Sequence, residues 1–140
     1  MSMIEGIRDW LRGYDDLAGQ RIGVDNIGSG VGSFAIMANG VPETVQEFFF
    51  ARTRKQSYFL ISNNAYGSEP FQNMENLKWY EDFGRWVYEQ DFHRNYPELG
   101  EHMTCVGVAA PTTGELVESK EDGHAYYQLQ LTVEYTESLF

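Results

Sequence analysis

One stretch of the chain constrains its fold more than any other. From residue 125 to residue 135 every second residue is apolar, and the residues between them are mostly polar. Successive side chains of a strand point to opposite faces, so this pattern predicts one long strand with a buried face and a solvated face. The turn pair Asp122-Gly123 comes just before it. We expect helices to cover the buried face.

Two helices are indicated elsewhere. Ser2 and Glu5 have capping-box spacing, which predicts a first helix from Met3 to about Leu11. A second, long helix is expected after Ser68, which can cap it. Asn95 and Pro97 close that helix, and its core stripe is expected to consist of Phe71, Met74, Leu77, Tyr80, Phe83 and Val87. Trp79 and Trp86 lie beside this stripe and fit either the core or a partner surface.

The remaining segments predict strands. Short strands are expected near residues 21–25 and 33–38. Residues 45–52 and 56–62 are rich in aromatic and β-branched residues and predict a hairpin with Thr53-Arg54-Lys55 at its tip. Residues 103–111 are apolar on both faces, which predicts a strand interior to the sheet. The order predicts a single α+β domain, residues 1–140, with a mostly antiparallel, possibly mixed sheet and both helices on one face.

Charge and composition narrow the possible functions. The 140 residues carry a net charge of −11, which disfavours sequence-specific nucleic-acid binding because phosphate contacts need Lys and Arg. The basic cluster Arg52, Arg54 and Lys55 is expected to contact an acidic partner surface. No run of about 18 apolar residues occurs, so no membrane-spanning segment is expected. The single Cys105 favours a reducing compartment.

The sequence offers no clear catalytic, cofactor or metal site. The Gly-rich segment Gly28–Ser33 precedes an expected strand, whereas a phosphate-binding loop opens a helix. His93 can pair with Glu89 on one helix face, but zinc needs three or four ligands. The acidic residues Glu75, Asp82 and Glu89 lie along one helix face and predict a solvated stripe. Cys105 has no basic neighbour in sequence to activate it. We therefore expect neither an enzyme nor a cofactor.

The chain resembles a family of small proteins of tailed bacteriophages and prophages of Gram-positive bacteria, labelled minor capsid or tail terminator-like. Loose patterns of packing and turns carry the resemblance: IEGIRDWL, AYGSEPFQNMENLKWYEDFGRWV, YPELGE, PTTGELVE and AYYQLQLTVEY. Some relatives are labelled chloramphenicol resistance proteins, which implies an acetyltransferase with a His-x-x-x-Asp-Gly motif. In this chain His124 follows Asp122-Gly123, so that activity is not expected.

The resemblance implies a structural role at the head–tail junction, as a tail terminator or tail completion subunit in a hexameric ring. Its partners would be copies of itself, the tail tube and head-completion proteins, in the host cytoplasm and then in the virion. DNA would pass the ring without specific binding, since the acidic surface offers the phosphates no counterions. The polar face of the last strand is the expected interface: Tyr126, Gln128, Gln130 and Thr132.

Two alternatives stay open at this point. One is an acidic cytoplasmic inhibitor or immunity-type protein, whose charge would match a basic toxin or mimic nucleic acid. The other is a small ligand-binding α+β protein whose aromatic residues line a pocket.

Overall fold

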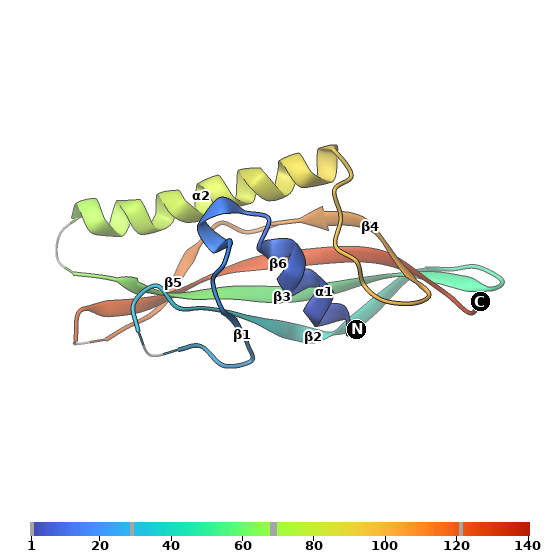
Figure 1. Ribbon diagram of the computed structural model, residues 1–140, viewed down its shortest axis with the longest axis horizontal. Helices are drawn as coiled ribbons and strands as arrows, with labels where there is room; N and C mark the ends of the chain where they lie inside the picture. The colour runs from blue at the N-terminus through green and yellow to red at the C-terminus, as the bar shows by residue number, and fades with distance from the viewer. Residues whose placement is uncertain (1, 29, 68–69, 121) are drawn as a thin grey trace.

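The structure, a computed structural model, describes residues 2–28, 30–67, 70–120 and 122–140. Two α-helices and a mixed, mostly antiparallel sheet of six strands give the expected α+β architecture (Figure 1). The helical elements are α1 (Met3–Leu11), a short 3-10 turn η1 (Asp15–Leu17) and α2 (Pro70–Phe92). The strands are β1 (Ile22–Val24), β2 (Phe34–Glu47), β3 (Ala51–Ala65), β4 (Met103–Ala109), β5 (Glu115–Ser119) and β6 (His124–Ser138).

Strand β6 holds the sheet together. Along one side it pairs with the whole of β3, and along the other it pairs first with β5 and then with β4. The order β1-β2-β3-β6-β4 is antiparallel throughout except for the short parallel pair of β1 and β2. This pair makes the sheet mixed.

The alternation expected for the last strand is confirmed. Six residues of β6 on one face, from Ala125 to Tyr135, are buried, and their neighbours are half-exposed. The buried residues form one core with Ile7 and Leu11 of α1 and with Phe83 of α2. Both helices therefore cover the same face of the sheet. Trp79 and Trp86 pack against this core, as one of the two interpretations of their position predicted.

Helix α1 is fixed by its cap and by one close approach. The Ser2 hydroxyl accepts a hydrogen bond from the Glu5 amide at 3.3 Å, which confirms the predicted start of the helix. A Cβ added at Gly6 would lie 1.7 Å from the carbonyl oxygen of Glu98, so only glycine allows this backbone contact. Trp10 donates from Nε1 to the Asn95 carbonyl oxygen at 2.8 Å. These contacts tie α1 to the segment between α2 and β4.

The predicted core stripe of α2 is correct only in its second half. Tyr80, Phe83 and Val87 are buried, whereas Phe71, Met74 and Leu77 are exposed. A helix turns about 100° per residue, so each step of three residues drifts about 60° around it. The spacing 71-74-77 therefore leaves the buried face, which continues instead through Asn76. The Asn76 side chain donates to the Ala65 carbonyl oxygen at 2.7 Å. Ser68, the expected cap, lies outside the described residues.

Three strand predictions are wrong. The strand expected at residues 33–38 continues without a break into the start of that expected at 45–52, because both belong to β2, which ends at Glu47 and has register shifts between Asn39 and Glu43 and between Thr44 and Gln46. Strand β4 lies at the edge of the sheet, not inside it, and a bulge at Val106 breaks its alternation. The linker before the last strand contains β5, whose residues are all exposed.

Candidate interaction surface

The basic cluster does not lie at the hairpin tip. Arg52, Arg54 and Lys55 are inside β3, and the turn is made by Phe48, Phe49 and Phe50. The Phe48 amide closes the turn by donating to the Ala51 carbonyl oxygen at 2.7 Å. The polar Thr-Arg-Lys segment was expected to turn because turns favour polar residues. Here the antiparallel pairing with β6 continues through this segment, because residues 51–55 pair with residues 134–138.

The three basic residues also point in different directions. Arg52 and Arg54 are opposite Glu137 and Tyr135 of β6, on the face that carries the core, whereas Lys55 is opposite Glu134 on the other face. Arg52 Nε lies 2.6 Å from Glu137 Oε1. Arg54 donates from Nη2 to a backbone oxygen.

Acidic residues flank the two outer members of the cluster. In the register of the sheet, Arg52 lies between Glu47 and Glu137, and Lys55 lies between Glu43 and Glu134. Acidic neighbours in the sheet balance these two positive charges, so Arg52 and Lys55 are poorly suited to bind an acidic partner surface.

The expected polar row of β6 exists as one surface. Tyr126, Gln128, Gln130 and Thr132 are half-exposed and share the face that the helices leave uncovered. Gln128 Nε2 donates to Glu115 Oε1 at 2.8 Å, and Gln130 Nε2 donates to Ser57 Oγ at 3.3 Å. Half-exposed Met37, Phe59 and Ile61 of β2 and β3 extend this face. We call the whole of it the open face.

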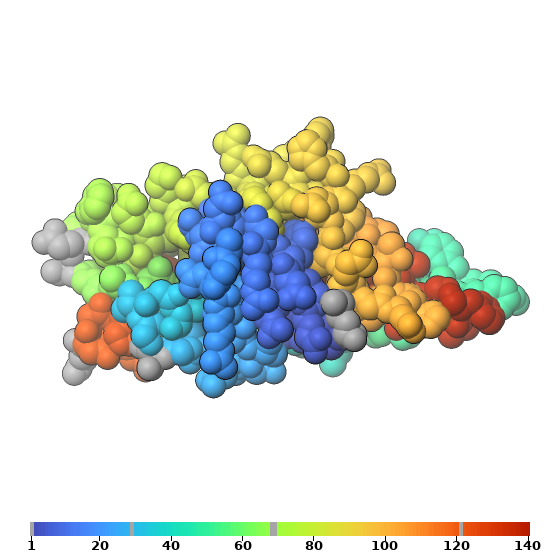
Figure 2. All heavy atoms as spheres, in the orientation of Figure 1, coloured from blue at the N-terminus to red at the C-terminus, as the bar shows by residue number. Residues whose placement is uncertain are grey.

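A more prominent apolar surface lies at the end of the hairpin. We call it the aromatic tip: Phe48, Phe49, Phe50, Leu139 and Phe140. Phe49 is 87% exposed and Phe140 is 80% exposed, and the other three are at least half-exposed. The ring centroids of Phe49 and Phe50 are 4.3 Å apart, and those of Phe50 and Phe140 are 5.2 Å apart. Figure 2 shows the hairpin turn and the red C-terminal residues together at the narrow end of the molecule.

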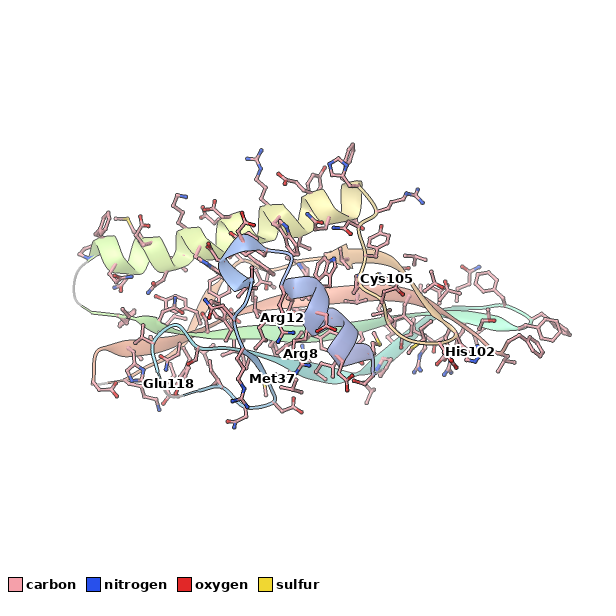
Figure 3. All side chains as sticks on the ribbon, in the orientation of Figure 1. Arg8, Arg12, Met37, His102, Cys105 and Glu118 are labelled. Carbon is pink, nitrogen blue, oxygen red and sulfur yellow. The ribbon has the colours of Figure 1, made fainter. Side chains whose placement is uncertain are left out.

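The aromatic tip borders a groove of about 580 Å³. Phe48, Phe49, Met103 and Leu139 supply apolar walls, and the ion pair of Arg52 and Glu137 also lines it. The groove is fixed by backbone contacts, because the Ser138 amide donates to the His102 carbonyl oxygen at 2.7 Å and the Leu139 amide to that of Phe50 at 2.9 Å. Figure 3 places His102 near this end of the molecule. A projecting ring and a groove thus lie side by side.

The edge strands carry features that hinder pairing with another sheet. The free edge of β2 contains Pro42 within the register shift between Asn39 and Glu43, and a second shift follows between Thr44 and Gln46. Strand β4 is bulged at Val106, and Asp91 Oδ1 of α2 accepts from the Val108 amide at 3.2 Å. Strand β5 has a register shift between Leu116 and Glu118. Bulges, proline and covered amides are the usual protection of sheet edges. Contacts through side chains are therefore favoured over sheet extension.

The candidates for chemistry are dispersed. Cys105 is buried, and burial raises the pKa of its thiol to about 11, which makes it a poor nucleophile at neutral pH. In the described part of the chain, no three His, Cys, Asp or Glu side chains gather as metal ligands would. Glu75, Asp82 and Glu89 are exposed, as expected of a solvated stripe. Among the described residues, neither helix is long and apolar enough to cross a membrane.

Sequence reasoning missed the aromatic tip although its signal was visible. Residues 48–50 are three consecutive phenylalanines. Phenylalanine favours strands, so the run was assigned to a strand and not to the turn. The comparisons with protein-family models and with curated proteins found no match.

Proposed function

We propose that the chain is a structural subunit of virion assembly, a tail terminator or tail completion protein that acts as an oligomeric ring at the head–tail junction. The observation that supports this best is the aromatic tip. Large exposed apolar patches usually mark protein–protein contacts, and aromatic side chains are enriched in interfaces. In this proposal the tips project from the ring and contact the tail tube or a head-completion protein.

The two layers of the molecule supply the contacts that close the ring. A ring needs two different surfaces on each subunit, one for each neighbour. Helix α2 has an outward row of exposed residues, Met74, Leu77, Tyr88 and Phe92, and the open face lies on the opposite side of the sheet. We propose that the outward row of one copy packs against the open face of the next, where Phe59 and Ile61 are half-exposed.

The charge is compatible with a channel for DNA. Six copies at −11 would carry about −66, and such a surface does not hold phosphates in place. The same charge opposes the packing of identical subunits, so ring formation should be favoured by salt, which screens charges beyond about 10 Å at 0.1 M.

Coexpression with the proteins encoded beside the chain in its own genome tests the function. We expect tail-tube and head-completion proteins among them, and closed rings capping tubes of uniform length in electron micrographs. Tubes that stay uncapped, or neighbours unrelated to virions, would contradict the proposal.

Substitution of Gln128 and Gln130 by Lys tests the ring contact. These two positions lie in the middle of the open face, so the double variant should fold normally and fail to close rings. A control with Lys at exposed Gln20, in the segment between η1 and β1 and outside the open face, should assemble. If the Gln128 and Gln130 variant assembles like the control, the open face is not the ring contact.

A further inference from the structure

We infer that in the free protein the aromatic tip is covered by the aromatic tip of a second copy, in a reciprocal contact about a two-fold axis. The inference concerns the chain alone and does not depend on a role in virions. It rests on the shape of the tip and on the area that the tip exposes, and the charges around the tip predict how the dimer responds to salt.

The tip is complementary to itself. A two-fold contact uses the same patch on both subunits, so a projecting part and a recess must lie together on that patch. Phe49 is the most exposed residue of the tip, and the groove of about 580 Å³ begins beside it. Phe48, Met103 and Leu139 give this groove apolar walls. The ring of Phe49 of one copy can therefore enter the groove of the other, and the reverse contact forms by symmetry.

The exposed area is close to what a weak dimer requires. A whole aromatic side chain buries roughly 200 Å². With the exposed fractions of the four phenylalanines and Leu139, the tip offers on the order of 600 Å² of apolar surface per copy. Standard interfaces bury about 800 Å² per partner, and weak ones bury less. We therefore expect a dimer that dissociates on dilution, not an obligate one.

The charges around the tip predict how the dimer responds to salt. Glu47, Glu101 and Glu137 line the groove, and Arg52 is the one Lys or Arg among the described residues that line it. Two facing tips bring like charges together, and screening by salt lowers this repulsion. The acidic rim also makes an anionic lipid surface a poor partner for the tip. In each subunit Arg52 offsets one of these acidic charges by pairing with Glu137.

Sedimentation of the purified chain over a range of concentrations tests the dimer. We expect a monomer–dimer equilibrium that shifts toward dimer as salt is raised. Phe49→Ser should raise the dissociation constant by at least about tenfold, as removal of an interface anchor does. The matched control is Phe71→Ser, at the start of α2, where a phenylalanine is 70% exposed. A chain that is monomeric at all concentrations, or a Phe71→Ser variant as impaired as Phe49→Ser, overturns the inference.

Disulfide trapping distinguishes a tip-to-tip contact from a tip bound elsewhere on a second copy. In a two-fold contact Phe49→Cys should cross-link to itself under mild oxidation, and the buried Cys105 should not react. A mixture of the Phe49→Cys and Phe71→Cys variants should give no mixed dimer. Preferential mixed cross-linking would place the tip on the body of its neighbour and refute the two-fold arrangement.

Both tests use the chain alone, so their outcome is separate from that of the proposed function. A dimer without capped tubes would leave the inference standing and refute the role in virions. Capped tubes assembled from a chain that is always monomeric in isolation would support the role in virions and refute the dimer. If the dimer and the role in virions are both correct, the tail-tube or head-completion protein should compete with dimerisation, because one tip cannot bind two partners at once.

Discussion

The two ends of the sheet are built from the same strands but are stabilised differently. In the body, where the helices cover the sheet, β3 alternates between buried residues such as Leu60 and half-exposed ones. In the arm, residues 40–55 and 136–140, neither helix covers the strands (Figure 1), and no side chain is buried. Pairing with β6 is continuous through both. A sheet can thus extend beyond its core, with backbone hydrogen bonds and cross-strand pairs maintaining an arm that presents its end to a partner.

The largest expected effect separates the body from the arm. Leu131 is fully buried, so Leu131→Ala should lower the free energy of unfolding by about 2–5 kcal/mol. Phe49→Ala removes a larger side chain, but one that is 87% exposed, and should change it by less than about 0.5 kcal/mol in the monomer. Urea denaturation of dilute protein measures both. A comparable loss for Phe49→Ala would mean that the arm contributes to the core.

Alkaline pH should weaken the body next. Burial raises the pKa of Cys105 from 9.0 to about 11 and that of Tyr58 from 10.0 to about 12. Both groups are neutral when protonated, and the unfolded chain loses these protons first. The stability that these two neutral groups contribute is therefore fully present below pH 9. It is lost as the pH rises toward 11 for Cys105 and toward 12 for Tyr58.

For Cys105 alone the full loss, reached above pH 11, corresponds to about 2–3 kcal/mol at about 1.36 kcal/mol for each pKa unit, and roughly two thirds of it is expected at pH 10.5. Denaturation at pH 8 and at pH 10.5 checks this, with Cys105→Ala as the control that should lose less stability over the same interval. Equal losses in the two proteins would show that the thiol does not contribute.

Two glycines in helices should respond to alanine with opposite signs. At Gly6 the added Cβ meets the Glu98 carbonyl oxygen at 1.7 Å, so the backbones must separate at a cost of about 1–3 kcal/mol. At Gly84 no atom lies within 4 Å of the added Cβ, and Gly84→Ala should stabilise the protein by about 0.5–1 kcal/mol. The melting temperatures of the two variants measure these effects, and we expect a decrease for Gly6→Ala and an increase for Gly84→Ala. Destabilisation by Gly84→Ala would show that the outer side of α2 is covered in solution.

The smallest effect is expected in the arm itself. Arg52 pairs with Glu137, but both side chains are about one third or more exposed, so Arg52→Ala should cost less than about 1 kcal/mol. Hydrogen exchange of the amides in residues 43–53 should nevertheless become faster, because the variant leaves Glu47 and Glu137 on the two strands beside residue 52 without the cation that lies between them. Unchanged exchange would mean that the backbone ladder alone maintains the arm.

Predictions from the sequence were more accurate for the body than for the arm. In the body, burial imposes a period on the sequence, and β6 and the second half of α2 were predicted from that period, whereas α1 was predicted from its capping box. In the arm nothing is buried, so no period distinguishes a strand from a turn, and propensity placed the turn at Thr53–Lys55 instead of Phe48–Phe50. The basic residues of the candidate site were misplaced for this reason.

The polar row of β6 was located correctly because it is the reverse of a buried face. The position of β4 at the edge could not be predicted in the same way. Its apolar composition resembles that of an interior strand, and the features that mark it as an edge are the bulge at Val106 and the Val108 amide that donates to Asp91 of α2, which the local sequence does not reveal.

The central place of β6 has a consequence for biosynthesis. This strand follows in the chain every strand that pairs with it, yet β3, β4 and β5 all need it as their neighbour. During translation the nascent chain can form α1, α2 and the hairpin of β2 and β3, but their apolar faces stay uncovered until β6 leaves the ribosome. Long-range strand pairing of this kind is slow, and waiting intermediates are prone to aggregate. Ribosome stalling before residue 124 should therefore yield chains that depend on chaperones.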